Sequence, residues 1–127
     1  MKLYSYKELI AWQKSIDLVE EIFKVTSGFP KSEIYGLSNQ MRRAAISIPS
    51  NIAEGAGRSH TKEFIQFLHI AEGSANELET QLIIVKRLNF LSEAAFNRLN
   101  EQLTEIIKMI VGLIKKLSYN SSLATSN

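Results

Sequence analysis

The two histidines, His60 and His69, are the residues of this chain best suited to acid–base or metal chemistry, because cysteine is absent. A di-iron site in a helical bundle requires Glu-x-x-His pairs. Gly57 lies three residues before His60, however, and Gln66 lies three residues before His69. Nucleophilic catalysis requires a base beside a nucleophile and a third group that orients it, and neither histidine belongs to such a pattern. We therefore expect no metal site, no cofactor and no catalytic residue, and we predict that the protein is not an enzyme.

A second group of polar residues lies in and just after a segment of small and aliphatic residues, Ser47 to Gly55. Asn51 and Glu54 are three residues apart, and Arg58 follows Glu54 by four, a spacing at which opposite charges pair on a helix. A buried carboxylate must be paired or hydrogen-bonded. We interpret Asn51, Glu54 and Arg58 as a polar clamp at a close helix crossing, and a ligand-binding role is the alternative.

Basic residues are concentrated between residues 31 and 62, where five basic groups accompany two glutamates, although the whole chain has a formal charge of only +2. Lysines and arginines on one surface bind phosphate groups without reading the base sequence of a nucleic acid. From composition alone, a solvated charged face is the alternative. The candidates for phosphate contacts are Arg42, Arg43, Arg58, Lys62, Lys86 and Arg87.

Four helical segments are expected to position these side chains, because apolar residues recur at steps of three and four. The predicted helices span about 6–27, 32–57, 61–88 and 93–117 in one domain of residues 1–117, followed by a flexible polar tail of residues 118–127. Pro49 is expected to kink the second helix. Short connections place successive helices antiparallel, and steps averaging about 3.5 residues favour a left-handed supercoil. The predicted fold class is all-α, an antiparallel up-down-up-down four-helix bundle.

More apolar residues are present than one core-facing stripe per helix requires. In the first helix the predicted core stripe is Leu9, Trp12, Ile16, Val19 and Phe23. Because monomers seldom expose large apolar patches, we predict that the remaining apolar residues cover an interface between copies of the chain, with a wider core as the alternative. The predicted interface residues are Leu18, Ile22, Val25, Ile107, Val111 and Ile114.

Membrane insertion is not expected. The longest apolar stretch, residues 106–117, is too short to span a bilayer and contains three lysines. The first residues do not form a signal peptide pattern, and the absence of cysteine fits a reducing compartment. We therefore expect a cytoplasmic protein.

The most specific string in the chain is Asn51-Ile52-Ala53-Glu54-Gly55. Further matching residues are Trp12, Phe29-Pro30, Gly36-Leu37, Arg42-Arg43-Ala44, Ser47-Ile48-Pro49-Ser50, Arg58, Lys62-Glu63-Phe64 and Glu77-Leu78. Together these residues, which span roughly residues 4–117, resemble the bacterial four-helix-bundle family named after proteins encoded in intervening sequences of 23S ribosomal RNA genes.

The resemblance implies a homopentameric ring of four-helix bundles. The family is similar to the accessory variability protein of diversity-generating retroelements, a basic pentamer that binds nucleic acid and a reverse transcriptase. We therefore expect a non-enzymatic pentamer that binds RNA or DNA, with structured RNA as the leading candidate. The alternative is a protein–protein scaffold whose ring recruits an enzyme partner.

Overall fold

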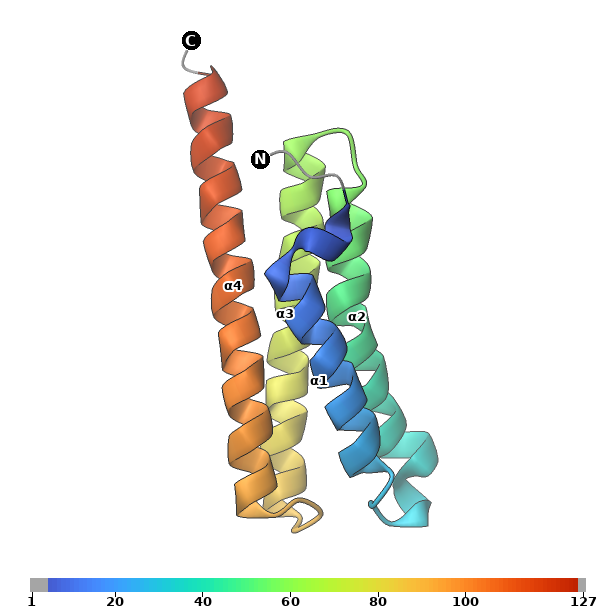
Figure 1. Ribbon diagram of the computed structural model, residues 1–127. Helices are drawn as coiled ribbons and strands as arrows, with labels where there is room; N and C mark the ends of the chain where they lie inside the picture. Colours follow the sequence, from blue (N-terminus) through green and yellow to red (C-terminus); the bar gives the residue numbers. More distant parts are fainter. Residues whose placement is uncertain (1–4, 126–127) are drawn as a thin grey trace.

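Four α-helices make up the fold (Figure 1), and the computed structural model describes residues 5–125, except for the side chains of residues 34, 35 and 123–125. The helices are α1 (Ile10–Thr26), α2 (Asn39–Ala56), α3 (Thr61–Arg87) and α4 (Glu93–Thr125). A 3₁₀ turn (Tyr6–Glu8) precedes α1, and a second 3₁₀ turn (Lys31–Glu33) and a π-helical turn (Ile34–Ser38) precede α2. The described residues contain no strand, so the predicted all-α class with four helices is confirmed.

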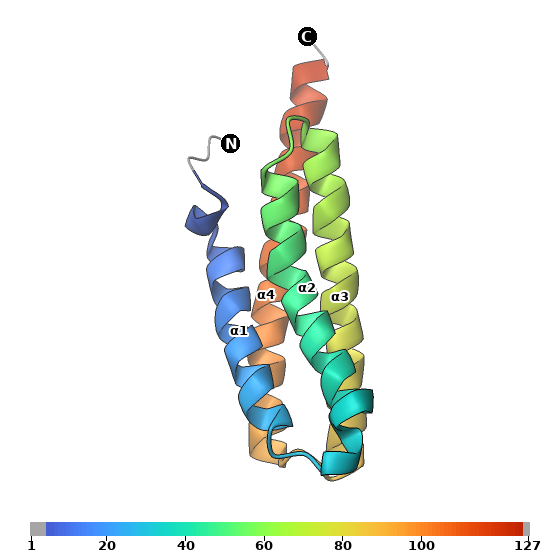
Figure 2. The same ribbon diagram turned by 90° about the vertical axis from the view of Figure 1, so that its right-hand side faces the viewer.

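The helices pack side by side, each against its neighbours in the sequence, and α1 also contacts α4. In Figures 1 and 2 the sequence colours run in opposite directions along successive helices. The α1–α2 and α3–α4 connections therefore lie at one end of the bundle, which we call the loop end. The α2–α3 turn lies at the opposite end, which we call the turn end. The left-handed supercoil stays a prediction.

The second helix begins later than the sequence pattern indicates. The departure from helical geometry in this region lies at Gly36, with φ −104° and ψ −107°, before α2 begins at Asn39. Glycine tolerates such angles because it has no Cβ. Pro49 is buried inside α2, and the helix continues beyond it to Ala56. A kink at Pro49 stays a prediction.

The last helix is longer than predicted. It does not end at Leu117 but continues to Thr125. Residues 118–125 contain neither glycine nor proline, and serine, tyrosine and asparagine reduce helix stability only slightly. The part of the expected polar tail that the structure describes is therefore helical, and residues 126–127 lie outside the described residues.

In α3 and α4, the apolar residues that recur at steps of three and four are largely buried, as that recurrence predicts. Leu78 and Leu82 of α3, and Leu103 and Ile110 of α4, are fully buried. In α1, however, the prediction selected the wrong face. Leu18 and Ile22 point into the core with 1% and 0% exposure, whereas Phe23 is 38% exposed. Trp12, Ile16 and Val19 are half-buried.

The reason is that small polar residues occupy part of the inward face of α1. Ser15 and Thr26 are buried on the same stripe as Leu18 and Ile22. The Ser15 hydroxyl donates to the Ala11 carbonyl oxygen at 2.7 Å, and the Thr26 hydroxyl donates to that of Ile22, also at 2.7 Å. Hydroxyls bonded to their own helix backbone do not need solvent. A pattern that counts only apolar residues therefore favours the neighbouring face, one residue or about 100° away.

The predicted interface set is corrected accordingly. Leu18, Ile22 and Ile114 are buried within a single chain and cannot contact a second copy. Val25 and Ile107 are half-buried and pack against the same core, and Val111 is also half-buried. For the three buried residues, the wider core was the correct alternative.

Candidate nucleic-acid interface

Basic residues of the α2–α3 turn and of two helices lie at the turn end. Arg58 lies between α2 and α3, and Lys62 lies in the first turn of α3. Leu117 of α4 lines the same hollow of about 250 Å³ as Arg58 and His60, so α4 passes directly beside the turn. The lysines that precede Leu117, Lys115 and Lys116, are exposed. We refer to Arg58, Lys62, Lys115 and Lys116 as the turn-end cluster.

Arg58 is held in place by its neighbours. One guanidinium nitrogen, Nη2, lies 2.8 Å from Glu54 Oε1, and the other, Nη1, lies 3.9 Å from Glu63 Oε2. The guanidinium carbon lies 4.9 Å from the centre of the Phe67 ring, within the range of a cation–π contact. The Arg58 side chain is nevertheless 41% exposed. The predicted Glu54–Arg58 ion pair is thus present, and it lies on the surface.

The three lysines of the cluster are less constrained. Lys62, Lys115 and Lys116 are exposed, and within residues 5–125 none of them lies within 4 Å of a carboxylate oxygen. An exposed ammonium group that is not paired with a carboxylate can pair with an incoming phosphate. These lysines are therefore the best-placed cations of the turn end for a polyanion.

At the loop end, two of the predicted phosphate contacts connect helices instead. Arg42 Nε donates to Thr26 Oγ1 at 2.8 Å, and its guanidinium carbon lies 4.7 Å from the centre of the Phe23 ring, which ties α2 to α1. Lys86 Nζ lies 4.4 Å from the centre of the Phe96 ring, which ties α3 to α4. Both side chains are half-buried.

The six predicted phosphate contacts therefore do not form one surface. Arg58 and Lys62 lie at the turn end, whereas Arg42, Arg43, Lys86 and Arg87 lie toward the loop end, where Arg43 and Arg87 are exposed. The α2 helix between Arg43 and Ala56 separates the groups by roughly 20 Å at 1.5 Å per residue.

The sequence prediction missed Lys115 and Lys116. They are far from the α2–α3 turn in the sequence, and only the packing of α4 brings them beside it. The available signal was the pair of adjacent lysines near the end of the last helix. An antiparallel bundle places that end beside the start of the third helix.

The polar contact between α2 and α3 has different members from those predicted. The Ser74 hydroxyl donates to Ser47 Oγ at 2.8 Å, and Asn51 Nδ2 donates to Ser47 Oγ at 2.9 Å and to the Ser47 carbonyl oxygen at 2.8 Å. Glu54 is 57% exposed and takes no part in this network. Asn51 therefore lies where the clamp was predicted, whereas Glu54 and Arg58 lie outside it.

The α2 and α3 backbones approach each other closely at Gly55. A Cβ added to Gly55 would lie 2.6 Å from Phe67 Cβ and 3.2 Å from the Phe64 carbonyl oxygen. The small residue that permits this crossing is therefore on α2. Gly73 of α3 faces open space instead.

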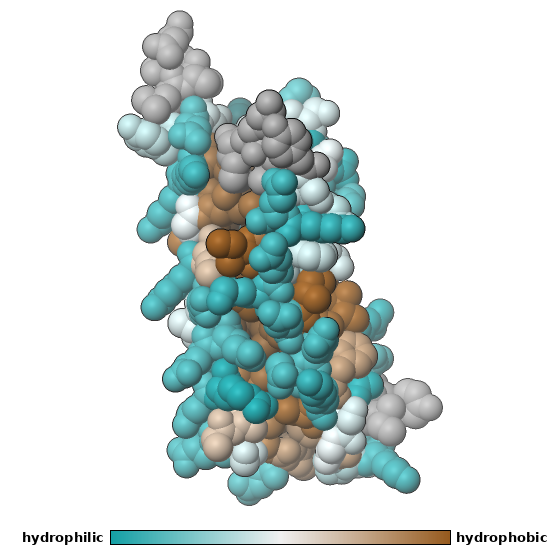
Figure 3. Space-filling model, in the orientation of Figure 1, coloured by the Kyte–Doolittle hydropathy of each residue, from teal (hydrophilic) through white to brown (hydrophobic). Residues whose placement is uncertain are grey.

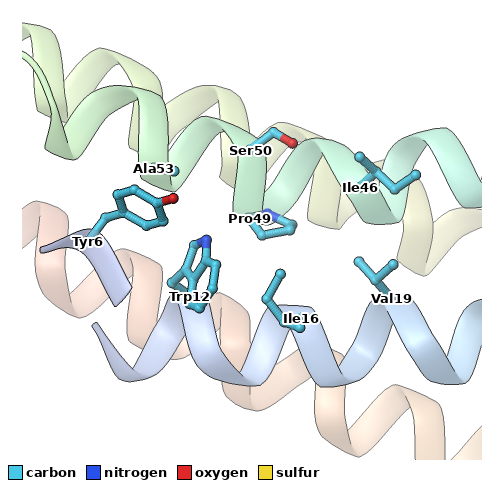
Figure 4. A pocket seen from close by; sticks show the side chains of 8 residues that line it. All are labelled: Tyr6, Trp12, Ile16, Val19, Ile46, Pro49, Ser50 and Ala53. Carbon is cyan, nitrogen blue, oxygen red and sulfur yellow. The ribbon is translucent and has the colours of Figure 1, made fainter. Parts of the chain in front are cut away.

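A shallow apolar groove runs between α1 and α2 (Figure 4). It has a volume of about 300 Å³, and in the space-filling view apolar surface is visible between rows of hydrophilic side chains on this side of the molecule (Figure 3). Ile46, at its edge, is 43% exposed. The residues of this α1–α2 groove are Tyr6, Trp12, Ile16, Val19, Ile46, Pro49, Ser50 and Ala53.

The histidines do not form a reactive constellation. His69 Nδ1 lies 3.2 Å from Glu72 Oε1 on the exposed side of α3, and His60 is exposed before α3. Among the residues that the structure describes, no three His, Cys, Asp or Glu side chains are grouped so that they could hold a metal ion. In the same residues, no helix has the length and apolar character that crossing a bilayer requires.

Comparison with known proteins identifies relatives of this fold. A family model described as 23S rRNA-intervening sequence protein matches residues 7–112, whereas no curated protein matches the sequence. The chain is also similar to a crystal structure from Bacteroides thetaiotaomicron, that of a protein with unknown function from the S23 ribosomal protein family. The identity is 27% and the TM-score 0.78, over 84% of this chain and 96% of the other. Because the family model spans most of the chain, the protein belongs to the family of 23S rRNA-intervening sequence proteins.

Proposed function

We propose that this protein is a cytoplasmic, non-enzymatic homopentamer that binds structured RNA through the turn end of its bundles. The observation that carries the proposal is that one end of the bundle holds four exposed basic residues, Arg58, Lys62, Lys115 and Lys116. Contacts of this kind position a protein on phosphates without reading bases.

The proposal depends on an oligomer that presents several copies of the turn end together, because the turn end of one chain is only weakly basic. The four cations of the turn-end cluster are accompanied by two carboxylates, Glu54 and Glu63, both of which lie near Arg58. In a ring of identically oriented chains, every turn end lies on the same face. Five copies would then present a cationic surface that a monomer lacks. The pentamer is the expectation that follows from the family resemblance.

The test is fluorescence anisotropy with a labelled RNA hairpin at two or more salt concentrations. Replacing Lys62, Lys115 and Lys116 with glutamine is expected to weaken binding and to reduce the slope of log affinity against log salt by about 0.7–0.9 for each lost phosphate contact. The matched control replaces Lys24, Lys31 and Arg87, three exposed cations of the loop end, with glutamine. This control removes the same charge and should leave most of the binding intact.

Equal losses in the two triple variants would contradict the assignment of the turn end, since only total charge would then matter. Binding that does not change with salt would contradict a phosphate interface altogether. The scaffold alternative predicts instead that a specific protein is recovered in a pull-down, with little RNA after nuclease treatment.

A further inference from the structure

The α1–α2 groove lies open on the surface of the single chain. It is mostly apolar, and Trp12, Ile16 and Val19 on its α1 wall remain half-exposed. Contiguous apolar surface of this kind usually marks a contact with another protein. We propose that a second copy of this chain fills the groove with one stripe of its α3 helix. This inference rests on the self-association stated in the proposed function, and it names the two surfaces that meet.

The stripe that we propose as the occupant consists of Ile70, Gly73 and Glu77, which we call the α3 face. These residues recur at steps of three and four, and all three are exposed, so they lie on one outward side of the helix. Ile70 is 50% exposed. A Cβ added to Gly73 would meet no heavy atom within 4 Å, so the backbone is open to a neighbour there. The α3 face therefore offers a projecting aliphatic side chain beside an accessible stretch of backbone.

The groove and the α3 face lie at the same level along the bundle. The Ser74–Ser47 hydrogen bond of 2.8 Å places these two residues opposite each other on α3 and α2. Ile70 lies one helical turn from Ser74 toward the turn end, and Ser50, which lines the groove, lies nearly one turn from Ser47 in the same direction. Copies that share one orientation would therefore bring Ile70 to the level of the groove without sliding along the bundle axis.

One helical turn further toward the loop end, the two surfaces carry opposite charges. Arg43 lies one turn from Ser47 toward the loop end, and Glu77 lies about one turn from Ser74 in the same direction. Both side chains are exposed, and no carboxylate oxygen of the described residues lies within 4 Å of Arg43. Glu77 Oε2 accepts a hydrogen bond from Gln81 Nε2 at 3.1 Å. When the α3 face enters the groove, Glu77 of one copy meets Arg43 of the next at the same height.

This arrangement determines the symmetry of the assembly. The projecting residue and the groove lie on different faces of one chain, so the contact is head-to-tail, and head-to-tail contacts of suitable rotation close into rings. A two-fold dimer would instead pair the groove with a second groove, or the α3 face with a second α3 face. Arg43 then serves the contact between copies and is removed from the phosphate contacts predicted for it.

The experiment is light scattering coupled to size-exclusion chromatography on the full chain. Ile46→Asp in the groove and Ile70→Asp on the α3 face are each expected to reduce the wild-type oligomer to monomer. Ile83→Asp is the matched control, because Ile83 is as exposed as Ile46, at 42% against 43%, but lies outside both surfaces. The control should keep the wild-type mass. Circular dichroism of each variant verifies that the helices remain folded.

Mixing the two monomeric variants tests the head-to-tail geometry directly. The Ile46→Asp chain keeps its α3 face and the Ile70→Asp chain keeps its groove, so one intact contact can form between them. The mixture should give particles of twice the chain mass and no larger ones. With a groove-to-groove contact, the Ile70→Asp chain would already associate with itself, and mixing would add no new species. That result would overturn the proposal.

The charge pair provides a second test with exposed residues only. Arg43→Glu and Glu77→Arg should each weaken the oligomer, and the double variant should restore it, because the opposite charges still meet between copies. An ion pair between Arg43 and Glu77 of the same chain would affect the stability of that chain but not the mass of the oligomer. A monomeric wild-type protein would contradict the oligomer of the proposed function. A wild-type oligomer that survives Ile46→Asp and Ile70→Asp would contradict only the surfaces named in this inference.

Discussion

At the α2–α3 seam the helix backbones approach so closely at Gly55 that a single added methyl group would collide with Phe67. The α1–α4 seam is bordered instead by two ion pairs, Lys14 with Glu105 at 2.8 Å and Arg98 with Glu21 at 3.5 Å. A hollow of about 150 Å³ lies beside the first of these pairs.

The contrast shows that different interactions hold the two pairs of helices together. The α2–α3 seam fixes the relative position of two helices through close contact at Gly55. The α1–α4 seam carries exposed ion pairs, and pairs of this kind usually stabilise a protein by less than about 1 kcal/mol. The helix with the weaker seam, α1, also forms one wall of the open groove. We infer that α2 and α3 contribute most of the specificity of the fold, and that α1 contributes surface.

The largest expected effects come from fully buried residues of the hydrophobic core. Because both seams border this core, substitutions in it should destabilise the protein to a similar extent on either side. Ile48 of α2 and Ile110 of α4 are both fully buried. Ile48→Ala and Ile110→Ala should each reduce the free energy of unfolding by about 2–5 kcal/mol, measured by urea denaturation at fixed protein concentration. Ile83→Ala, at an exposed position, is the control. A loss near zero for Ile110→Ala alone would mean that α4 is not part of the core.

Glycine substitutions provide the sharpest test of the α2–α3 seam. Gly55→Ala should reduce the free energy of unfolding by about 1–3 kcal/mol, because the new methyl group forces the helices apart. Gly112→Ala in α4 meets no atom within 4 Å and should instead stabilise the protein by up to about 1 kcal/mol through better helix propensity. Thermal or urea denaturation measures both. If the two variants change stability in the same direction, close contact does not define this seam.

A smaller effect is expected for the polar contact across the same seam. Ser47→Ala removes the oxygen that accepts from both Ser74 and Asn51, and should reduce the free energy of unfolding by about 1 kcal/mol. Thr80→Ala, which removes an exposed hydroxyl bonded within its own helix, should change stability by less than about 0.5 kcal/mol. Equal effects in urea denaturation would show that the Ser47 network does not hold α2 to α3.

The smallest effect is expected at the α1–α4 border. A double-mutant cycle of Lys14→Met and Glu105→Gln should give a coupling energy of about 0.2–1 kcal/mol, because both side chains are about half exposed. The coupling should decrease at high salt, since salt screens exposed charges. Lys108→Met, at an exposed position of α4, is the control for loss of charge. A coupling larger than the Gly55→Ala effect would reverse the comparison of the seams.

Much of the fold could be predicted from local patterns. The buried faces of α3 and α4 follow the apolar recurrence, because their buried positions are almost all apolar, as with Leu78, Leu82, Leu103 and Ile110. The inward face of α1 was not found, because Ser15 and Thr26 satisfy their hydroxyls on their own helix. The candidate site was only half predicted, since Arg58 and Lys62 lie near the turn in sequence, whereas Lys115 and Lys116 reach it only through packing.

The sequence by itself determined the class of fold, the family and the Glu54–Arg58 pair, because periodicity, specific strings and i, i+4 spacing are properties of neighbouring residues. Only the tertiary structure decided which face of α1 is buried, that α2 and α3 approach closely at Gly55, and which cations share one end of the bundle. Those outcomes depend on the rotation and level of each helix against the others, and no local spacing specifies them.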